Sequence, residues 1–235
     1  MSQATTLVQG KIRREKSTVR HIFNLLDGAD CFIAGGFARY VCSPCPAPVL
    51  PGDIDLYCAS ESAFSQAQES LLRARLTQTH DTPFSVSFRD ARSRLFRRFD
   101  LVIQLVKPIK LGEIALYGGI ESVAAGFDLS VLCVAIIDAT TALQHPSFEE
   151  DEYHRRIVLL SIPCPYAAIY RISKYMAKGY RLPAVELTKL FATWDLKPDE
   201  YKTSVCALLE QHGMSAGYGE LMIHRASEES RRQNR

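Results

Sequence analysis

Two aspartates separated by a single residue give the sequence its clearest chemical signal. Asp53 and Asp55 lie in residues 53–57, which alternate polar and apolar side chains as a half-buried strand does. Side chains at positions i and i+2 of a strand project from the same face, so these two carboxylates can share metal ions. A second expected strand, residues 99–106, carries Asp100. If the two strands are neighbours, Asp100 brings a third carboxylate to the same place.

Three carboxylates at one place predict a magnesium site rather than a zinc site, because hard oxygen ligands suit Mg²⁺ and leave positions for water and phosphate. We expect two magnesium ions, with Mn²⁺ as the alternative. Two such ions serve phosphoryl transfer, in which one activates an attacking hydroxyl and the other stabilises the leaving pyrophosphate. Asp53 and Asp55 are expected to bridge both ions, and Asp100 to help activate the hydroxyl.

A pair of glycines offers a place for the phosphates. Residues 31–34 predict a buried strand, Gly35 and Gly36 predict a tight turn, and residues 37–41 begin a short helix. Glycine lets backbone amides approach phosphate oxygens closely, and a helix N-terminus adds a favourable dipole. Arg39, in the first turn of that helix, would add a positive charge to a nucleotide site.

Each of these signals alone has an ordinary structural explanation. A Gly-Gly pair is usually a turn, and Asp-x-Asp is usually a solvated strand edge or loop. Their order along the chain favours a site. Amide donors at the end of one strand and metal ligands at the start of the next can be bridged by one phosphate chain.

The remaining segments predict an α+β fold, with a small mixed sheet and flanking helices followed by a helical C-terminal region. After Pro146 the segments are helical only, so we place a domain boundary near residue 145, between a catalytic domain (1–145) and a helical domain (146–235). Periodicity does not decide between strand and buried helix for residues 127–137. Another strand is expected at residues 84–88, and helices at 11–27, 63–76, 120–125, 148–160, 166–179, 184–194, 198–212 and 217–229.

The composition is that of an ordinary intracellular protein. The chain has 235 residues, 47% of them hydrophobic, and a net charge of +2. It shows neither a membrane-spanning run nor a secretory signal, so we expect a cytoplasmic protein without a membrane partner. Seven cysteines spread through apolar segments suit reduced thiols. Cys42 and Cys45 lack a second pair of zinc ligands, so we expect a loop with two idle thiols.

Taken in order, the motifs resemble those of a known family. Residues 35–39 read GGFAR and residues 52–56 read GDIDL. They resemble the G-G-x-V-R-D and D-x-D-L signature of the head domain of tRNA nucleotidyltransferases and bacterial poly(A) polymerases, within the DNA polymerase beta-like superfamily. Residues 127–138 (FDLSVLCVAIID) resemble the family's R-D-F-T-I-N-A-L-A-Y-D block, and residues 170–180 more loosely resemble its helical L-R-A-L-R-F segment.

This resemblance implies a polymerase beta-like nucleotidyltransferase fold and a role for each matching residue. Asp53 and Asp55 would be metal ligands, and Gly35 and Gly36 would bind the triphosphate. Asp100 corresponds to a carboxylate on the neighbouring strand. The other contacts to the incoming nucleotide would be Asp128, Arg171 and Lys174.

The leading hypothesis is therefore an enzyme that binds ATP or another nucleoside triphosphate, transfers the nucleoside monophosphate to a hydroxyl, and releases pyrophosphate. An RNA 3′ end, a protein hydroxyl and a small molecule all remain candidate acceptors, and base preference and oligomeric state stay open. CCA addition is not expected, because Gly126 and Phe127 replace an arginine pair of the family and Leu132 replaces its asparagine. The compact chain would suit a virus-encoded member of the superfamily.

Two hypotheses from other classes stay open. The first is a nucleotide-binding regulatory or structural module that has kept the fold and lost turnover. The second is a nucleic-acid-binding protein in which the carboxylates are incidental. Magnesium-dependent triphosphate binding without pyrophosphate release would favour the first, and salt-sensitive RNA or DNA binding that survives loss of Asp53 and Asp55 would favour the second.

Two groups of basic residues each have two interpretations. The first group crowds the connection before Asp100 and either guides a polyanionic acceptor or protects a hairpin edge. It consists of Arg92, Arg94, Arg97 and Arg98. The second group shares one face of the helix expected at residues 166–179, by i, i+3 and i+7 spacing, and faces either phosphate or solvent. It consists of Arg171, Lys174 and Lys178.

Overall fold

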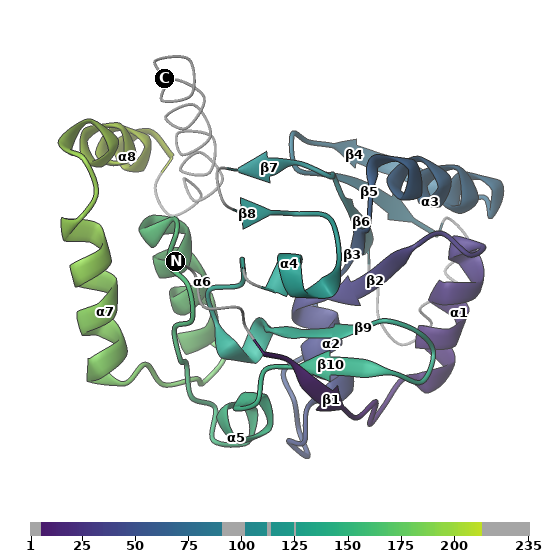
Figure 1. Ribbon diagram of the computed structural model, residues 1–235, viewed down its shortest axis with the longest axis horizontal. Helices are drawn as coiled ribbons and strands as arrows, with labels where there is room; N and C mark the ends of the chain where they lie inside the picture. Colours follow the sequence, from purple (N-terminus) through teal and green to yellow (C-terminus); the bar gives the residue numbers. More distant parts are fainter. Residues whose placement is uncertain (1–5, 91–101, 112–113, 125, 213–235) are drawn as a thin grey trace.

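The computed structural model describes residues 6–90, 102–111, 114–124 and 126–212. Its centre is an eight-stranded sheet in which β3 and β6 run parallel and the other described neighbours run antiparallel (Figure 1). The mixed sheet and its flanking helices confirm the α+β fold class. In spatial order the strands are β1 (Val8–Gly10), β10 (Ala142–Gln144), β9 (Val134–Ile136), β2 (Cys31–Ala34), β3 (Asp53–Cys58), β6 (Val102–Val106), β5 (Ser85–Arg89) and β4 (Thr77–Asp81). A separate pair is formed by β7 (Lys110–Leu111) and β8 (Ile114–Ala115).

The two faces of the central strand β3 differ in chemistry. Ile54, Leu56 and Cys58 are fully buried in the main hydrophobic core. Asp53 and Asp55 alternate with them and are only partly buried, as the period-two pattern of the sequence predicts. The sheet therefore buries one face of β3 for stability and leaves the carboxylate face available for chemistry.

Three helices pack on the core face of the sheet: α1 (Lys16–Leu26), α2 (Gly35–Cys42) and α3 (Glu61–Arg73). In α1, Val19, Ile22 and Leu26 recur at helical spacing and are buried against the strands. The first turn of α3 is capped by Ser60, whose side-chain oxygen accepts a hydrogen bond of 3.1 Å from the backbone N–H of Ala63. On the other face, α4 (Ile120–Ala124) packs on a smaller cluster that includes residues of β2 and β9.

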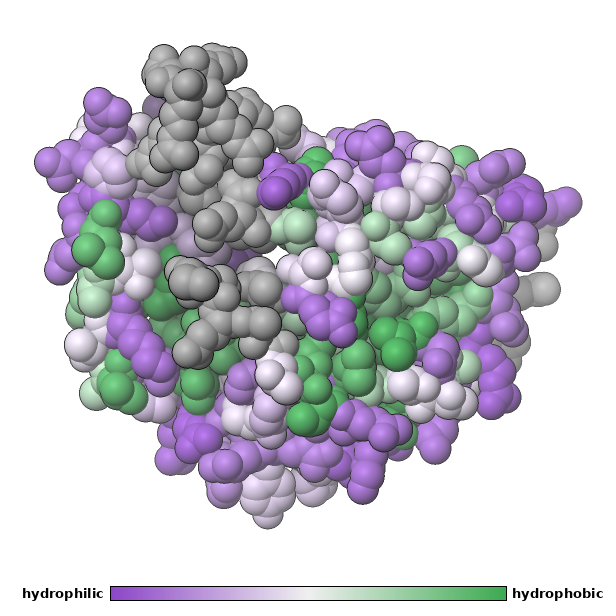
Figure 2. Space-filling view, viewed as in Figure 1, coloured by the Kyte–Doolittle hydropathy of each residue, from purple (hydrophilic) through white to green (hydrophobic). Residues whose placement is uncertain are grey.

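The C-terminal helices are α5 (Phe148–Tyr153), α6 (Pro165–Met176), α7 (Ala184–Asp195) and α8 (Asp199–His212). Figure 1 shows α6, α7 and α8 gathered at the left of the sheet. Their apolar side chains form two further clusters, one with the segment around Leu129 and one between α6 and α8. Figure 2 shows hydrophobic atoms, in green, along the left edge where α7 lies, and this helix exposes Val185, Leu187 and Phe191.

Several expected elements differ from the structure. The first helix begins at Lys16 rather than residue 11, after Glu15 adopts a positive φ of 53°. Strand β4 was not expected because its residues are polar and exposed, and so lack an apolar alternation. Residues 127–137 contain a 3₁₀ turn (Ser130–Leu132) and strand β9. The helix expected at 148–160 ends at Tyr153, because Arg155 adopts a positive φ of 50°. The chain beyond it forms isolated β-bridges, from Arg156 to Arg181 and from Leu159 to Leu129.

Other expectations lie outside the described residues or stay untested. The helix expected at residues 217–229 and the arginines between residues 91 and 101 are not described. The domain boundary near residue 145 stays a prediction. Within the described parts of the chain, no helix is long and apolar enough to cross a membrane.

Candidate active site

Asp53 and Asp55 line an open cavity of about 280 Å³. Strand β6 lies beside β3, with Gln104 opposite Asp55 in the register. The Gln104 side chain also lines the cavity, and its Nε2 donates a hydrogen bond of 3.0 Å to Oδ2 of Asp53. Asp100 lies outside the described residues, and among those that are described no three His, Cys, Asp or Glu side chains gather as a metal site. Gln104 was missed in the sequence because an amide is not a typical metal-site signal.

The electrostatics of this carboxylate pair fit a divalent cation. The pKa of Asp55 is raised to about 8, first by burial and then by the negative charge of Asp53, while the positive charge of Lys174 acts in the opposite direction. The charge of Asp53 on the same strand face therefore disfavours the ionised form of Asp55. A bound cation would remove this repulsion, and oxygen donors of this type suit Mg²⁺. The residues present thus fit the ion that the sequence predicts.

The glycine pair lies directly beside these carboxylates. Strand β2 ends at Ala34, which is opposite Asp55 in the antiparallel register, and α2 begins at Gly35. Gly35 has φ +71°, and a Cβ at this position would lie 2.6 Å from Oδ2 of Asp55. A Cβ on Gly36 would meet no atom within 4 Å, so Gly36 faces open space and lines the cavity. The N-terminal amides of α2, which have no partner within their own helix, therefore begin next to the two carboxylates.

Basic side chains of α6 and of the turn that follows it also line this cavity. The helix expected at residues 166–179 ends at Met176, so Lys178 lies in that turn. Arg171, Lys174 and Lys178 all contribute to its wall, so the structure favours the cavity-facing interpretation of their spacing. Burial lowers the pKa of Lys178, and the nearby charges of Lys174 and Arg39 lower it further, while Asp53 opposes them. Lys178 was not among the predicted nucleotide contacts. Its i+7 spacing from Arg171 was the sequence feature that placed it on the same face as the predicted contacts.

Asp128 and Arg171 are brought into direct contact at the cavity wall. Asp128 is buried, and its Oδ2 accepts a hydrogen bond of 2.6 Å from Nε of Arg171. Burial works against the charged guanidinium, but the charge of Asp128 and this hydrogen bond outweigh it and raise the pKa of Arg171. The two residues therefore act as one fixed polar unit.

Aromatic side chains form another part of the wall. Tyr57, which shares the carboxylate face of β3, stacks on Phe32 with ring centroids 5.7 Å apart. Its ring is also nearly perpendicular to that of Phe127, with ring centroids 6.1 Å apart. Tyr57 and Phe127 both line the cavity, together with Tyr170 of α6. Sequence reasoning did not single them out, because aromatic residues in apolar segments are usually core residues.

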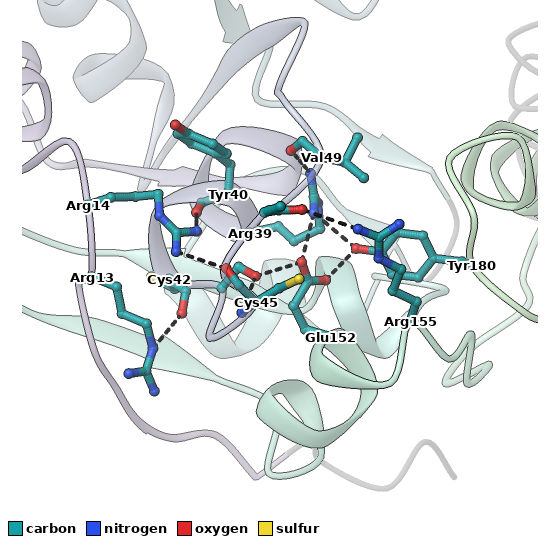
Figure 3. Close-up of polar contacts among 12 residues, drawn as sticks. Arg13, Arg14, Arg39, Tyr40, Cys42, Cys45, Val49, Glu152, Arg155 and Tyr180 are labelled. Atoms are coloured by element: carbon teal, nitrogen blue, oxygen red, sulfur yellow. Dashed lines mark hydrogen bonds and ion pairs between the residues drawn. The ribbon is translucent and has the colours of Figure 1, made fainter.

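Arg39 is the predicted nucleotide contact whose placement differs most from expectation. Although it borders the cavity, its side chain is buried and its guanidinium is bonded to protein oxygens (Figure 3). Nη1 contacts Glu152 at 2.9 Å and the Tyr180 hydroxyl at 3.0 Å, and Nη2 donates to the Val49 carbonyl at 2.6 Å. This placement argues against Arg39 as a phosphate ligand. The sequence could not reveal it, because Glu152 lies far along the chain and in another helix.

Comparison with known proteins supports the fold. No protein-family model matches the sequence, and no curated protein matches it. A solved tRNA-processing enzyme in its apo form is 16% identical and aligns over 93% of this chain and 59% of its own, with a TM-score of 0.51. A CCA-adding enzyme in its apo form is 13% identical over 89% of this chain and 51% of its own, with a TM-score of 0.51. A further tRNA-processing enzyme complex is 14% identical over 85% and 57%, with a TM-score of 0.51.

The chain spans between half and three-fifths of the length of these solved chains. At this level of identity the likeness concerns the fold. The chain therefore shares its fold with these solved tRNA-processing and CCA-adding enzymes.

Proposed function

We propose that this protein is a magnesium-dependent nucleotidyltransferase that transfers a nucleoside monophosphate from a nucleoside triphosphate to a hydroxyl and releases pyrophosphate. One observation carries the proposal. Elements β3, α2 and α6, which are separate in the sequence, bring a carboxylate pair, a glycine turn and a basic helix face to one cavity. Acidic and basic side chains around one cavity suit a ligand that contains both metal ions and phosphates.

In this proposal Asp53 and Asp55 hold the magnesium ions, with Asp100 as the third ligand and Mn²⁺ as the alternative ion. Bound ions would supply the activation of the acceptor hydroxyl and the neutralisation of the leaving pyrophosphate. Gln104 orients Asp53 through its amide hydrogen bond. The protein's contribution at this wall is to hold two oxygen ligands on a rigid strand.

The triphosphate is proposed to lie between the glycine turn and α6. The backbone amides at the start of α2 would donate to phosphate oxygens, and Gly36 leaves room for that approach. Lys174 and Lys178, which line the same cavity, would neutralise phosphate charge. Asp128 and Arg171 would contact the nucleotide, and Tyr57 offers a flat apolar surface on the same strand face as the carboxylates.

We propose an RNA 3′ end as the first acceptor to test, because solved chains of the same fold include tRNA-processing enzymes. A protein hydroxyl and a small molecule are the other two candidates. All three would present a hydroxyl to the same carboxylate edge, so the proposed reaction does not depend on this choice.

The test is release of pyrophosphate from each of the four nucleoside triphosphates, with magnesium and pooled RNA. Wild type is compared with Asp53→Ala/Asp55→Ala and with the control Glu69→Ala/Asp195→Ala, which removes two exposed carboxylates elsewhere. The proposal expects release from wild type and control and none from the first variant. Triphosphate binding without release from wild type would indicate a nucleotide-binding module instead.

A further inference from the structure

The loop between α2 and β3 accepts hydrogen bonds from arginine side chains of three separate segments. This loop, residues 43–52, contains four prolines, which cannot donate backbone hydrogen bonds. Its carbonyls at Cys45, Ala47 and Val49 instead accept hydrogen bonds from guanidinium groups (Figure 3). The donors are Arg14 at 3.1 Å, Arg155 at 3.2 Å and Arg39 at 2.6 Å, respectively.

Arg39 is the buried member of this set and joins the loop to an ion pair. Its Nη1 lies 2.9 Å from Oε1 of Glu152, and both side chains are only 1% exposed. The same Oε1 accepts a hydrogen bond of 2.8 Å from Ser43, the first residue of the loop. Tyr180 donates to Oε2 of Glu152 at 2.5 Å. One ion pair therefore holds the loop at its start and, through Val49, near its end.

The C-terminal end of this loop and helix α6 both line the cavity. Pro51 and Gly52 line it immediately before Asp53. The Arg39 guanidinium also lies over the Tyr175 ring of α6, at 5.7 Å from its centre, and the Lys178 ammonium lies 5.3 Å from the same ring centre. Arg39 thus contacts both the loop that leads into β3, through Val49, and helix α6, through Tyr175.

We propose that Arg39 and Glu152 are positioning residues, whose ion pair fixes loop 43–52 and α6 relative to β3 and thereby sets the affinity of the cavity for a magnesium-bound triphosphate. The inference rests on the proposed function. Neither side chain is assigned to the reacting atoms. Buried ion pairs contribute little net stability but hold one geometry, because an unpaired buried charge is strongly disfavoured. That property suits an ion pair that fixes the position of loop 43–52 relative to α6.

The test compares unfolding temperature with the Kd of each of the four magnesium nucleoside triphosphates. Arg39→Lys keeps the charge near Glu152 but loses the planar fork that reaches Val49 and Glu152 together. We expect its Kd to rise about tenfold at temperatures where the protein stays folded, because small misplacements of binding groups are costly. Tyr180→Phe removes one hydroxyl that contacts both partners, and its Kd should rise about threefold.

The control is Val205→Ala, which opens space in the cluster between α6 and α8 and touches neither the loop nor the ion pair. It should lower the unfolding temperature and leave the Kd unchanged. If Arg39→Lys and Tyr180→Phe behave like this control, the role of the pair is structural and the inference is wrong. If Arg39→Lys does not fold, Tyr180→Phe decides the question alone. Absence of triphosphate binding in wild type would instead overturn the proposed function, and the inference with it.

Discussion

The backbone of Gly35 lies against the carboxyl of Asp55, so closely that a Cβ at residue 35 would come within 2.6 Å of Oδ2. This contact fixes the start of α2 to the carboxylate strand. It also explains why the turn needs glycine at its first position, where φ is +71°. The proposed phosphate and metal sites are therefore parts of one rigid unit.

The two glycines of this turn should respond differently to alanine. Gly35→Ala should destabilise the protein by about 1–2 kcal/mol or more, because a positive φ and the contact with Asp55 both disfavour a side chain. Gly36→Ala should fold like wild type, because its Cβ meets open space, and should mainly weaken triphosphate binding. Thermal unfolding and titration with magnesium nucleoside triphosphates measure both effects. Equal unfolding temperatures for the two variants would contradict this assignment.

Replacing Asp55 with asparagine should stabilise the metal-free protein above neutral pH. The pKa of Asp55 is raised to about 8 in the folded chain, first by burial and then by Asp53. A raised pKa in a carboxyl means that stability is lost as pH rises from the ordinary aspartate pKa toward 8. In EDTA at about pH 8.5, Asp55→Asn should raise the free energy of unfolding by at least about 1 kcal/mol. This corresponds to an unfolding temperature about 2–4 °C higher.

The same comparison near pH 5 is the control for Asp55→Asn, because the folded wild type then holds the carboxyl proton. The difference in unfolding temperature should shrink there. Magnesium should reverse the order at high pH by stabilising wild type and not the variant. A variant that is less stable than wild type in EDTA at every pH would contradict this electrostatic account.

Lys174 and Lys178 should each contribute to triphosphate affinity. Removal of either ammonium, in Lys174→Met or Lys178→Met, should raise the Kd about tenfold, since hydrogen bonds to charged groups are worth about 1.5–3 kcal/mol. Lys202→Met is the matched control, because this lysine pairs with Asp199 on α8 and does not line the cavity. Loss of affinity in the control alone, or in none of the three, would remove α6 from the site.

The seven cysteines should divide into two reactivity classes. Cys45 and Cys206 are accessible, and the other five are buried. Burial raises the pKa of Cys42 and of Cys133 to about 12, which leaves little thiolate at neutral pH. A colorimetric thiol reagent should therefore titrate two fast thiols in the native protein and seven in denaturant. Cys45→Ser/Cys206→Ser should lose the fast phase, and a fast phase that survives would show that a buried thiol is accessible.

The parts of the site that depend on local pattern could be predicted from the sequence. The alternation in residues 53–57 placed Asp53 and Asp55 on one strand face, and the glycine pair marked the join between β2 and α2. The order of these motifs also indicated the fold class. Such features follow from neighbours in the chain, and so they survive without knowledge of tertiary structure.

The parts that depend on long-range contact could not be predicted. Nothing near Arg39 indicates that Glu152 and Tyr180 enclose its guanidinium, so a local interpretation assigned it to the nucleotide. The spacing of Lys178 left open whether it faces phosphate or solvent, and only the tertiary structure places it at the cavity. Strand β4 has exposed polar residues throughout and is a strand because β5 pairs with it.

The most direct test of the central claim follows two labels on the nucleotide. The protein is incubated with magnesium, pooled RNA and nucleoside triphosphates that carry ³²P at the α position in one series and at the γ position in the other. We predict that the α label becomes attached to the acceptor, that the γ label leaves as pyrophosphate, and that Asp55→Asn abolishes both. Attachment of the γ label instead, or α-label transfer that persists in Asp55→Asn, would contradict nucleotidyl transfer at this carboxylate pair.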